Sequence, residues 1–201
     1  MVNLKFDNMK ELIENRIRQS IAIKLELLNQ PDLLQNLEKL AEVCIKSLKS
    51  GGKVLFCGNG GSAADAQHLA AELSGRFYYD RPPLSSEALH VNTSYLTAVA
   101  NDYSYDEIYA RLIQGLGRKG DVLIGLSTSG NSANVVKAFM AATDKEMITA
   151  GFTGMGGGKM KAYSNFTLQV PSNDTPRIQE AHILLGHILC EYIEAEIFPK
   201  P

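Results

Sequence analysis

The sequence predicts an α/β protein: a doubly wound, mainly parallel five-stranded sheet flanked by helices, with further helices at the N-terminus. Three observations predict this fold class. Strand-like and helix-like segments alternate from residue 53 to residue 196, Gly-rich and Ser-rich loops follow several of the strands, and two amphipathic segments precede the first strand. Such alternation places helices on both faces of a parallel sheet. The 201 residues are enough for one domain with a substantial core.

The N-terminal segment, residues 1–50, is predicted to be helical. Residues 8–28 place apolar side chains at helical spacing, namely Met9, Leu12, Ile13, Ile17, Ile21, Leu25 and Leu28. Pro31 ends this pattern, and a second helix is expected from Asp32 to Leu48, closed by Gly51 and Gly52. The first of these helices is expected to be long and amphipathic.

Residues 51–201 are expected to form the α/β core. The predicted strands are 53–57, 86–91, 121–126, 147–153 and 166–170, and the predicted helices are 62–74, 94–100, 105–116, 132–143 and 176–196. No internal repeat or linker divides the chain, so residues 1–201 are predicted to be a single domain. Ligands of such sheets bind at the carboxyl ends of the strands, and the functional residues are therefore expected there.

Composition excludes several classes of protein. A net charge of −2 argues against binding to nucleic acid or to an anionic membrane surface. No apolar run approaches the roughly 20 residues that cross a bilayer, and the N-terminus lacks a signal pattern. The three cysteines, Cys44, Cys57 and Cys190, form no C-x-x-C motif. A reduced, cytoplasmic protein with buried thiols is the expectation.

Two loops have the composition of phosphate-binding loops. Asn59, Gly60, Gly61 and Ser62 follow the first strand and open a helix, whose N-terminus offers free N–H groups to an anion. The alternative is a tight turn with Ser62 as N-cap. Neither a Walker loop nor the G-x-G-x-x-G spacing is present, which disfavours nucleotide binding.

The second loop is rich in hydroxyl groups and again lies between a strand and a helix. It carries Ser127, Thr128, Ser129 and Ser132, and these can donate several hydrogen bonds to one anion without a fixed charge. A Ser-rich turn with one capping serine is the alternative. A third Gly cluster, residues 154–160, is interpreted as a connection that requires positive φ angles.

Two helices carry polar residues that could bind a metal ion. His68 and Glu72 are four residues apart, so they project from one helix face; a plain surface hydrogen bond is the alternative. The terminal helix carries Gln179, His182 and His187. His187 lies in an apolar run, where a lone histidine is usually a core residue with its hydrogen bonds satisfied. Gln179 and His187 are eight residues apart, about 12 Å of helical rise. Both reach one ion only if the helix begins after Gln179 or if neighbouring subunits share sites.

Four motifs together resemble the bacterial phosphoheptose (sedoheptulose-7-phosphate) isomerases, which have the flavodoxin-like SIS fold. They are residues 58–77 (GNGGSAADAQHLAAELSGRF), 100–102 (AND), 127–132 (STSGNS) and 177–182 (RIQEAH). The resemblance covers nearly the whole chain. It implies conversion of sedoheptulose 7-phosphate to D-glycero-D-manno-heptose 7-phosphate, the first step toward nucleotide-activated heptose for lipopolysaccharide or capsule.

The resemblance also implies site residues. Zn²⁺ ligands would be His68, Glu72, Gln179 and His187, with one ion in each subunit. Members of the family are homotetramers with active sites between subunits, and the N-terminal helices of this chain would extend to the oligomer interface. Substrate-binding residues would be Asn59, Gly60, Gly61, Ser62, Glu72, Asn101, Asp102, Ser127, Thr128, Ser129, Ser132 and Gln179. The aldose–ketose reaction needs a base at carbon and a group that moves protons between oxygens, and Glu72 and His187 are the expected pair.

Two residues depart from the family pattern. Ala71 replaces a second Glu, which should be harmless, and Pro176 precedes the Arg-Ile-Gln motif, where it suits the start of a helix. The rival hypotheses are a non-catalytic SIS protein that binds the replication initiator and a sugar-phosphate sensor. The initiator-binding relative lacks the carboxylate that matches Glu72, which this chain retains.

Overall fold

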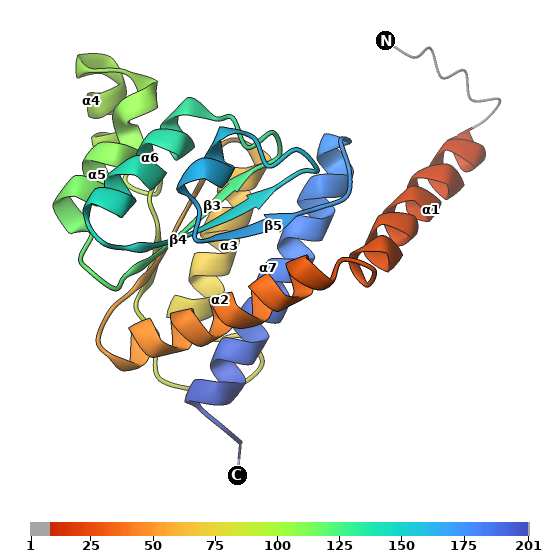
Figure 1. Ribbon diagram of the computed structural model, residues 1–201, viewed down its shortest axis with the longest axis horizontal. Coiled ribbons are helices and arrows are strands. Elements are labelled where there is room, and N and C mark those ends of the chain that lie inside the picture. The colour runs from red at the N-terminus through yellow and green to blue at the C-terminus, as the bar shows by residue number, and fades with distance from the viewer. Residues whose placement is uncertain (1–8, 201) are drawn as a thin grey trace.

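The computed structural model describes residues 9–200 and contains one five-stranded sheet (Figure 1). The strands are β1 (Val54–Gly58), β2 (Ser86–Ala88), β3 (Val122–Ser127), β4 (Ile148–Thr153) and β5 (Phe166–Gln169). They lie in the order β2-β1-β3-β4-β5, and every pair is parallel. Because the order reverses between β1 and β3, the loops that follow these two strands diverge at one edge and frame the position where doubly wound sheets bind ligands.

Helices cover both faces of the sheet, as predicted. They are α1 (Met9–Leu27), α2 (Pro31–Lys49), α3 (Gly61–Ser74), α4 (Thr93–Asp102), α5 (Ile108–Leu116), α6 (Ala133–Asp144) and α7 (Thr175–Ile197). Val54 and Phe56 of β1 join the core beneath α2, α3 and α7, whereas Leu55 and Cys57 join the core beneath α4, α5 and α6. The period of two along a strand therefore divides the apolar side chains between two cores.

Most predicted boundaries lie within one or two residues of the observed ones, and the larger differences concern the second strand and two 3₁₀ helices. The strand predicted at 86–91 ends at Ala88, and the helix predicted at 105–116 begins as a separate 3₁₀ turn over Tyr105–Glu107. A second 3₁₀ helix, Lys159–Tyr163, was not predicted. The terminal helix starts at Thr175, with Pro176 in its first turn, as a proline at a helix start should be. Residue 8, the expected start of the first helix, lies outside the described residues.

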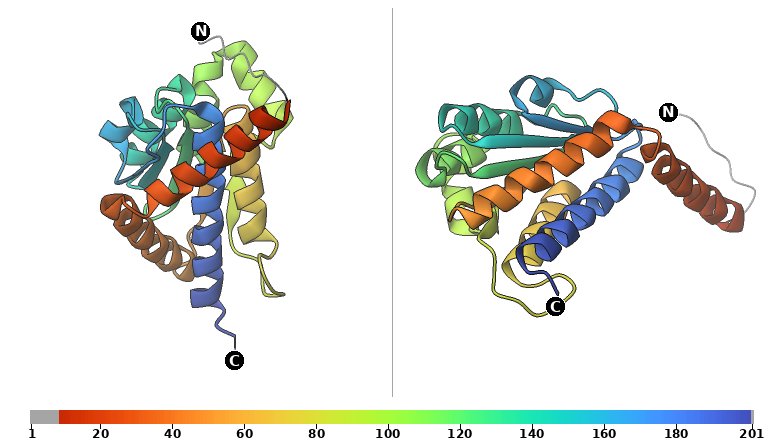
Figure 2. Two further views of the ribbon diagram at one scale, coloured as in Figure 1. Left: turned by 90° about the vertical axis from the view of Figure 1, so that its right-hand side faces the viewer. Right: turned by 60° about the horizontal axis from the view of Figure 1, so that its bottom comes forward.

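Helix α1 projects from the body of the molecule (Figures 1 and 2). Its only fully buried side chain is Leu27. The predicted amphipathic pattern is confirmed, but its apolar side chains are exposed in the single chain, namely Met9, Ile13, Ile17, Ile21 and Leu25. Within residues 9–200, no helix is long and apolar enough to cross a membrane.

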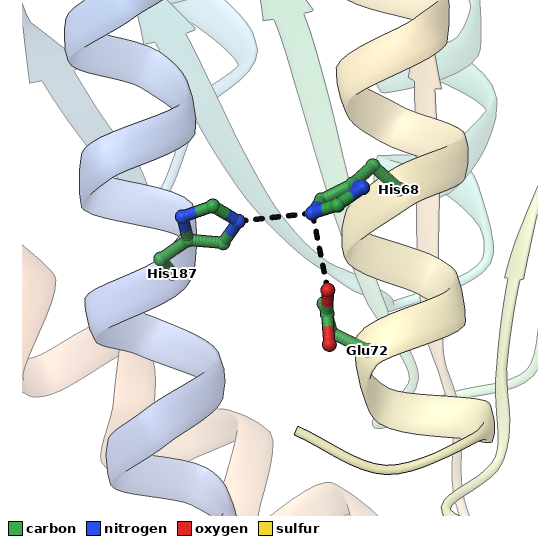
Figure 3. A group of neighbouring side chains, drawn as sticks. All are labelled: His68, Glu72 and His187. Atoms are coloured by element: carbon green, nitrogen blue, oxygen red, sulfur yellow. Dashed lines mark hydrogen bonds and ion pairs between the residues drawn. The ribbon is translucent and has the colours of Figure 1, made fainter. Parts of the chain in front are cut away.

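Helices α3 and α7 run parallel and in close contact, and this packing positions the site. A Cβ atom on Gly186 would lie 2.4 Å from the side chain of Leu69, so only glycine permits this approach. His68 immediately precedes Leu69 on α3, and His187 immediately follows Gly186 on α7 (Figure 3). Gly186 therefore brings histidines from two helices within reach of each other.

Candidate functional site

Three side chains that can bind a metal ion converge between α3 and α7 (Figure 3). The Nε2 atom of His68 lies 3.0 Å from Nε2 of His187 and 3.1 Å from Oε1 of Glu72. One nitrogen or oxygen atom of each residue lies within 4.8 Å of the others. These residues, the histidine–glutamate group, are three of the four predicted ligands, and the structure brings these three together.

The protonation chemistry of this group favours a bound cation. A neutral imidazole carries one N–H, so Nε2 of His68 can donate to Glu72 or to His187 but not to both. With Glu72 ionised, at most one of the two contacts can therefore be a hydrogen bond. A divalent ion with nitrogen and oxygen ligands resolves this arrangement, and two His and one carboxylate form a known catalytic zinc set. The donor set therefore fits the expected ion.

The group is partly open to solvent, as a site must be. The side chain of His68 is 52% exposed and that of Glu72 is 20% exposed. Burial and the neighbouring His68 lower the pKa of His187, although the Glu72 carboxylate acts in the opposite direction. His187 is thus favoured in its neutral form, which can bind a metal ion or accept a proton. The ring of Phe77 packs against His187, with 5.7 Å between ring centroids.

A buried ion pair, Arg81–Glu194, holds the segment that follows α3 against α7. Nε of Arg81 donates to Oε1 of Glu194 over 2.9 Å, and the backbone N–H groups of Phe77 and Tyr78 donate to the same carboxylate. The guanidinium also donates to the carbonyl of Glu72 over 2.8 Å. This pair therefore fixes the backbone of Glu72 and the position of Phe77 beside His187. Sequence reasoning did not identify it.

The loop after β1 reaches the start of α7. Gly60 has φ of 56° and is the N-cap of α3, so the alternative prediction that Ser62 caps this helix was wrong. Ser62 is instead buried in the first turn. A Cβ atom on Gly61 would lie 2.7 Å from Nε2 of Gln179, so the Gln179 amide packs directly against the backbone of this loop. Two predicted substrate-binding segments, far apart in sequence, therefore meet here.

The hydroxyl loop after β3 keeps most of its donors away from helix capping. Ser132 is the N-cap of α6 but makes no side-chain cap hydrogen bond; its Oγ lies 2.9 Å from Oγ of Ser127. The carbonyl of Thr128 accepts from Gly154, and Oγ of Ser129 accepts from the N–H of Asn131. The interpretation as a turn with one capping serine therefore fails.

The third Gly cluster, residues 154–160, lies beside this loop. Gly157 and Gly158 have positive φ angles, as predicted.

Asn101 and Asp102 lie at the end of α4, where both are exposed. Nδ2 of Asn101 donates a hydrogen bond to Oδ1 of Asp102. Three residues after Asp102, the hydroxyl of Tyr105 donates to Oδ1 of Asn59. Asn59 also pairs with Asn134 of α6. Neither Tyr105 nor Asn134 was identified from sequence; the only signal for Asn134 was a polar residue among apolar positions of a helix.

Gln179 lies apart from the histidine–glutamate group along α7. Because α7 begins at Thr175, Gln179 is inside the helix, about 12 Å of rise from His187. This excludes the option that the helix starts after Gln179. The other option from the sequence is a site shared between neighbouring subunits, in which Gln179 of one subunit joins His187 of another at one ion.

Comparisons with known proteins place the chain in a family. The model of the SIS domain matches residues 20–154. The phosphoheptose isomerase of Clostridium acetobutylicum is 50% identical over 190 residues, which cover 94% of this chain and 97% of that protein. The chain belongs to the phosphoheptose isomerase family. Among solved structures, the phosphoheptose isomerase of Neisseria gonorrhoeae has a TM-score of 0.87 at 43% identity, covering 94% of this chain and all of that chain.

A second solved phosphoheptose isomerase, from Francisella tularensis, has a TM-score of 0.88 at 36% identity and covers 92% of this chain and 98% of that chain. The parallel sheet, the two loops and the long terminal helix therefore belong to the fold of the phosphoheptose isomerases. The fold and family expected from the four motifs are confirmed.

Proposed function

We propose that the protein is an aldose–ketose isomerase that converts sedoheptulose 7-phosphate to D-glycero-D-manno-heptose 7-phosphate through an enediol. The observation that carries the proposal is the histidine–glutamate group, an open acid–base and metal-binding set in a chain 50% identical to a phosphoheptose isomerase. The product would supply nucleotide-activated heptose for lipopolysaccharide or capsule.

The phosphate would bind at the hydroxyl loop. Ser127, Thr128, Ser129 and Ser132 supply hydroxyl groups at the N-terminus of α6, and the helix dipole favours an anion there. Asn59, Gly60, Gly61, Ser62, Asn101 and Asp102 would hold the sugar hydroxyls. Binding energy from the remote phosphate can then orient C1 and C2 toward the reacting groups.

His68, Glu72 and His187 would hold Zn²⁺, with Gln179 supplied by a neighbouring subunit. The ion would polarise the carbonyl oxygen and stabilise negative charge on the enediolate.

The side chains would carry the protons. The carboxylate of Glu72 takes the proton from C1 of the ketose and returns it to C2, while His187 moves a proton from the C1 hydroxyl to the C2 oxygen. The proton count closes, because one C–H and one O–H bond break and one of each forms. Because burial and the neighbouring His68 lower the pKa of His187, its ring is favoured in the neutral form that can accept the hydroxyl proton.

The exposed apolar face of α1 supports assembly with further copies of this chain. Side chains such as Ile17, Ile21 and Leu25 would be covered in a homotetramer, which we propose as the active form in the cytoplasm. In such an assembly, Gln179 of one subunit would join the histidine–glutamate group of another.

The experiment is incubation of the purified protein with sedoheptulose 7-phosphate, with and without added Zn²⁺, and detection of the aldose. Turnover is expected. A wild-type protein that is folded, loaded with metal and still inactive would overturn the proposal and favour the non-catalytic alternatives, a replication-initiator-binding or sugar-phosphate-sensing SIS protein.

A further inference from the structure

Asn134 makes a reciprocal pair of hydrogen bonds with Asn59. Nδ2 of Asn59 donates to Oδ1 of Asn134, and Nδ2 of Asn134 donates to Oδ1 of Asn59, each over 2.8 Å. Asn134 is 2% exposed, in the first turn of α6. The pair therefore joins the loop after β1 to the helix after β3, across the edge where the strand order reverses.

The direction of the pair is fixed by the backbone. The N–H of Val135 donates to Oδ1 of Asn134 over 2.9 Å, so the oxygen and the nitrogen of that amide cannot exchange places. Nδ2 of Asn134 must then face Oδ1 of Asn59. That oxygen also accepts from the hydroxyl of Tyr105 over 3.1 Å. With its oxygen bonded to two donors, the amide of Asn59 keeps one N–H for another acceptor.

We infer that Asn134 is a positioning residue, which orients Asn59 so that its remaining N–H donates to an oxygen of the sugar phosphate. The inference rests on the proposed function, in which Asn59 binds substrate. Asn134 lies two residues after Ser132, and Tyr105 lies three residues after Asp102. The amide pair and the hydroxyl of Tyr105 thus connect three predicted substrate-binding segments through the side chain of Asn59. Without Asn134, the amide of Asn59 can rotate. The side chain of Asn59 must then be ordered when the substrate binds, which weakens binding.

A double-mutant cycle tests this role. Asn59→Ala and Asn134→Ala are each expected to raise KM and the Kd for sedoheptulose 7-phosphate about tenfold or more, with a smaller change in kcat. Because Asn134 acts through Asn59, the double variant should match Asn59→Ala alone. Losses that multiply in the double variant, or an unchanged KM and Kd in Asn134→Ala, would overturn the inference.

Asn165→Ala is the matched control. Its amide oxygen accepts a hydrogen bond from the N–H of Thr149, near the start of β4 and away from the carboxyl ends of the strands, where the substrate is proposed to bind. This variant is expected to lower the melting temperature while leaving KM unchanged; an equal rise in KM would assign the Asn134 effect to general loosening of the fold. Calorimetric Kd values separate the isomerase proposal from the positioning role of Asn134. A wild-type protein that binds sedoheptulose 7-phosphate without turnover refutes the isomerase proposal, and the double-mutant cycle can still be evaluated from Kd. A wild-type protein that neither binds nor converts the sugar phosphate refutes both proposals.

Discussion

Two polar clusters lie between the α3 region and α7, about two helical turns apart along α7, and they differ in how their hydrogen-bonding groups are satisfied. In the Arg81–Glu194 pair, both carboxylate oxygens accept backbone N–H groups and the guanidinium donates to Glu194 and to several carbonyls. Its side chains are only 2% and 1% exposed. In the histidine–glutamate group, Nε2 of His68 contacts both Glu72 and His187 but can donate to only one of them. The side chains of this group are also partly exposed to solvent.

The difference separates a structural role from a chemical one. A buried pair whose partners are all present has no bonding capacity left for a ligand, and it serves to hold the backbone in place. A group whose lone pairs converge on one point is incomplete until a proton, a metal ion or a substrate joins it. Both clusters contain a glutamate, so the unsatisfied hydrogen-bonding capacity, and not the presence of a carboxylate, is what identifies the site.

The largest effect is expected from Glu72→Gln. The substitution keeps the size of the side chain but removes the base, so kcat should fall about 10²–10⁴-fold, the usual contribution of a general base. The melting temperature should change little, because Glu72 lies in an open site rather than in the core. A steady-state assay and a thermal melt check both halves, and retention of more than a tenth of wild-type kcat would remove Glu72 from the reaction.

Glu194→Gln should show the opposite pattern. Removing one charge of a buried pair leaves Arg81 uncompensated, and the free energy of unfolding is expected to fall by about 3 kcal/mol. Denaturant titration measures the loss. Glu191→Gln, an exposed position one turn earlier on α7, is the matched control and should be neutral. A stable Glu194→Gln protein would contradict the structural role given to the pair.

A smaller effect, dependent on pH, is expected from His182 on the same buried stripe of α7. Burial lowers the pKa of His182 to about 4, although a hydrogen bond with the carbonyl of Thr153 acts in the opposite direction. The unfolded chain binds a proton near pH 6.5 and the folded chain does not, so stability should fall as the pH decreases from about 7 to 4. His182→Asn should flatten this slope in unfolding measurements across that range. An unchanged slope would place the titration elsewhere.

The sequence was a good guide where information is local. Apolar periodicity located the helices and strands, and the spacing of His68 and Glu72 placed both on one face. It could not pair Arg81 with Glu194, because these residues are 113 positions apart and only the packing of α7 joins them. A weak signal existed: Glu194 falls on the buried stripe that contains Leu189, Cys190 and Ile193, where a charge requires a buried partner.

Glycines illustrate the same limit. The role of Gly186 follows from the contact with Leu69 of α3, which is distant in sequence and visible only in the folded chain. The Asn59–Asn134 pair was equally hidden, because the two asparagines meet only when β1 and β3 become neighbours.

Calorimetric titration of the metal-free protein with Zn²⁺ tests the contrast between the two clusters most directly. One ion per chain is expected to bind to the wild type and to Glu191→Gln, and binding should be lost or greatly weakened in His68→Ala and His187→Ala variants that remain folded. Equal affinity in all four proteins, or no binding to the folded wild type, would contradict the account that the histidine–glutamate group is the functional site.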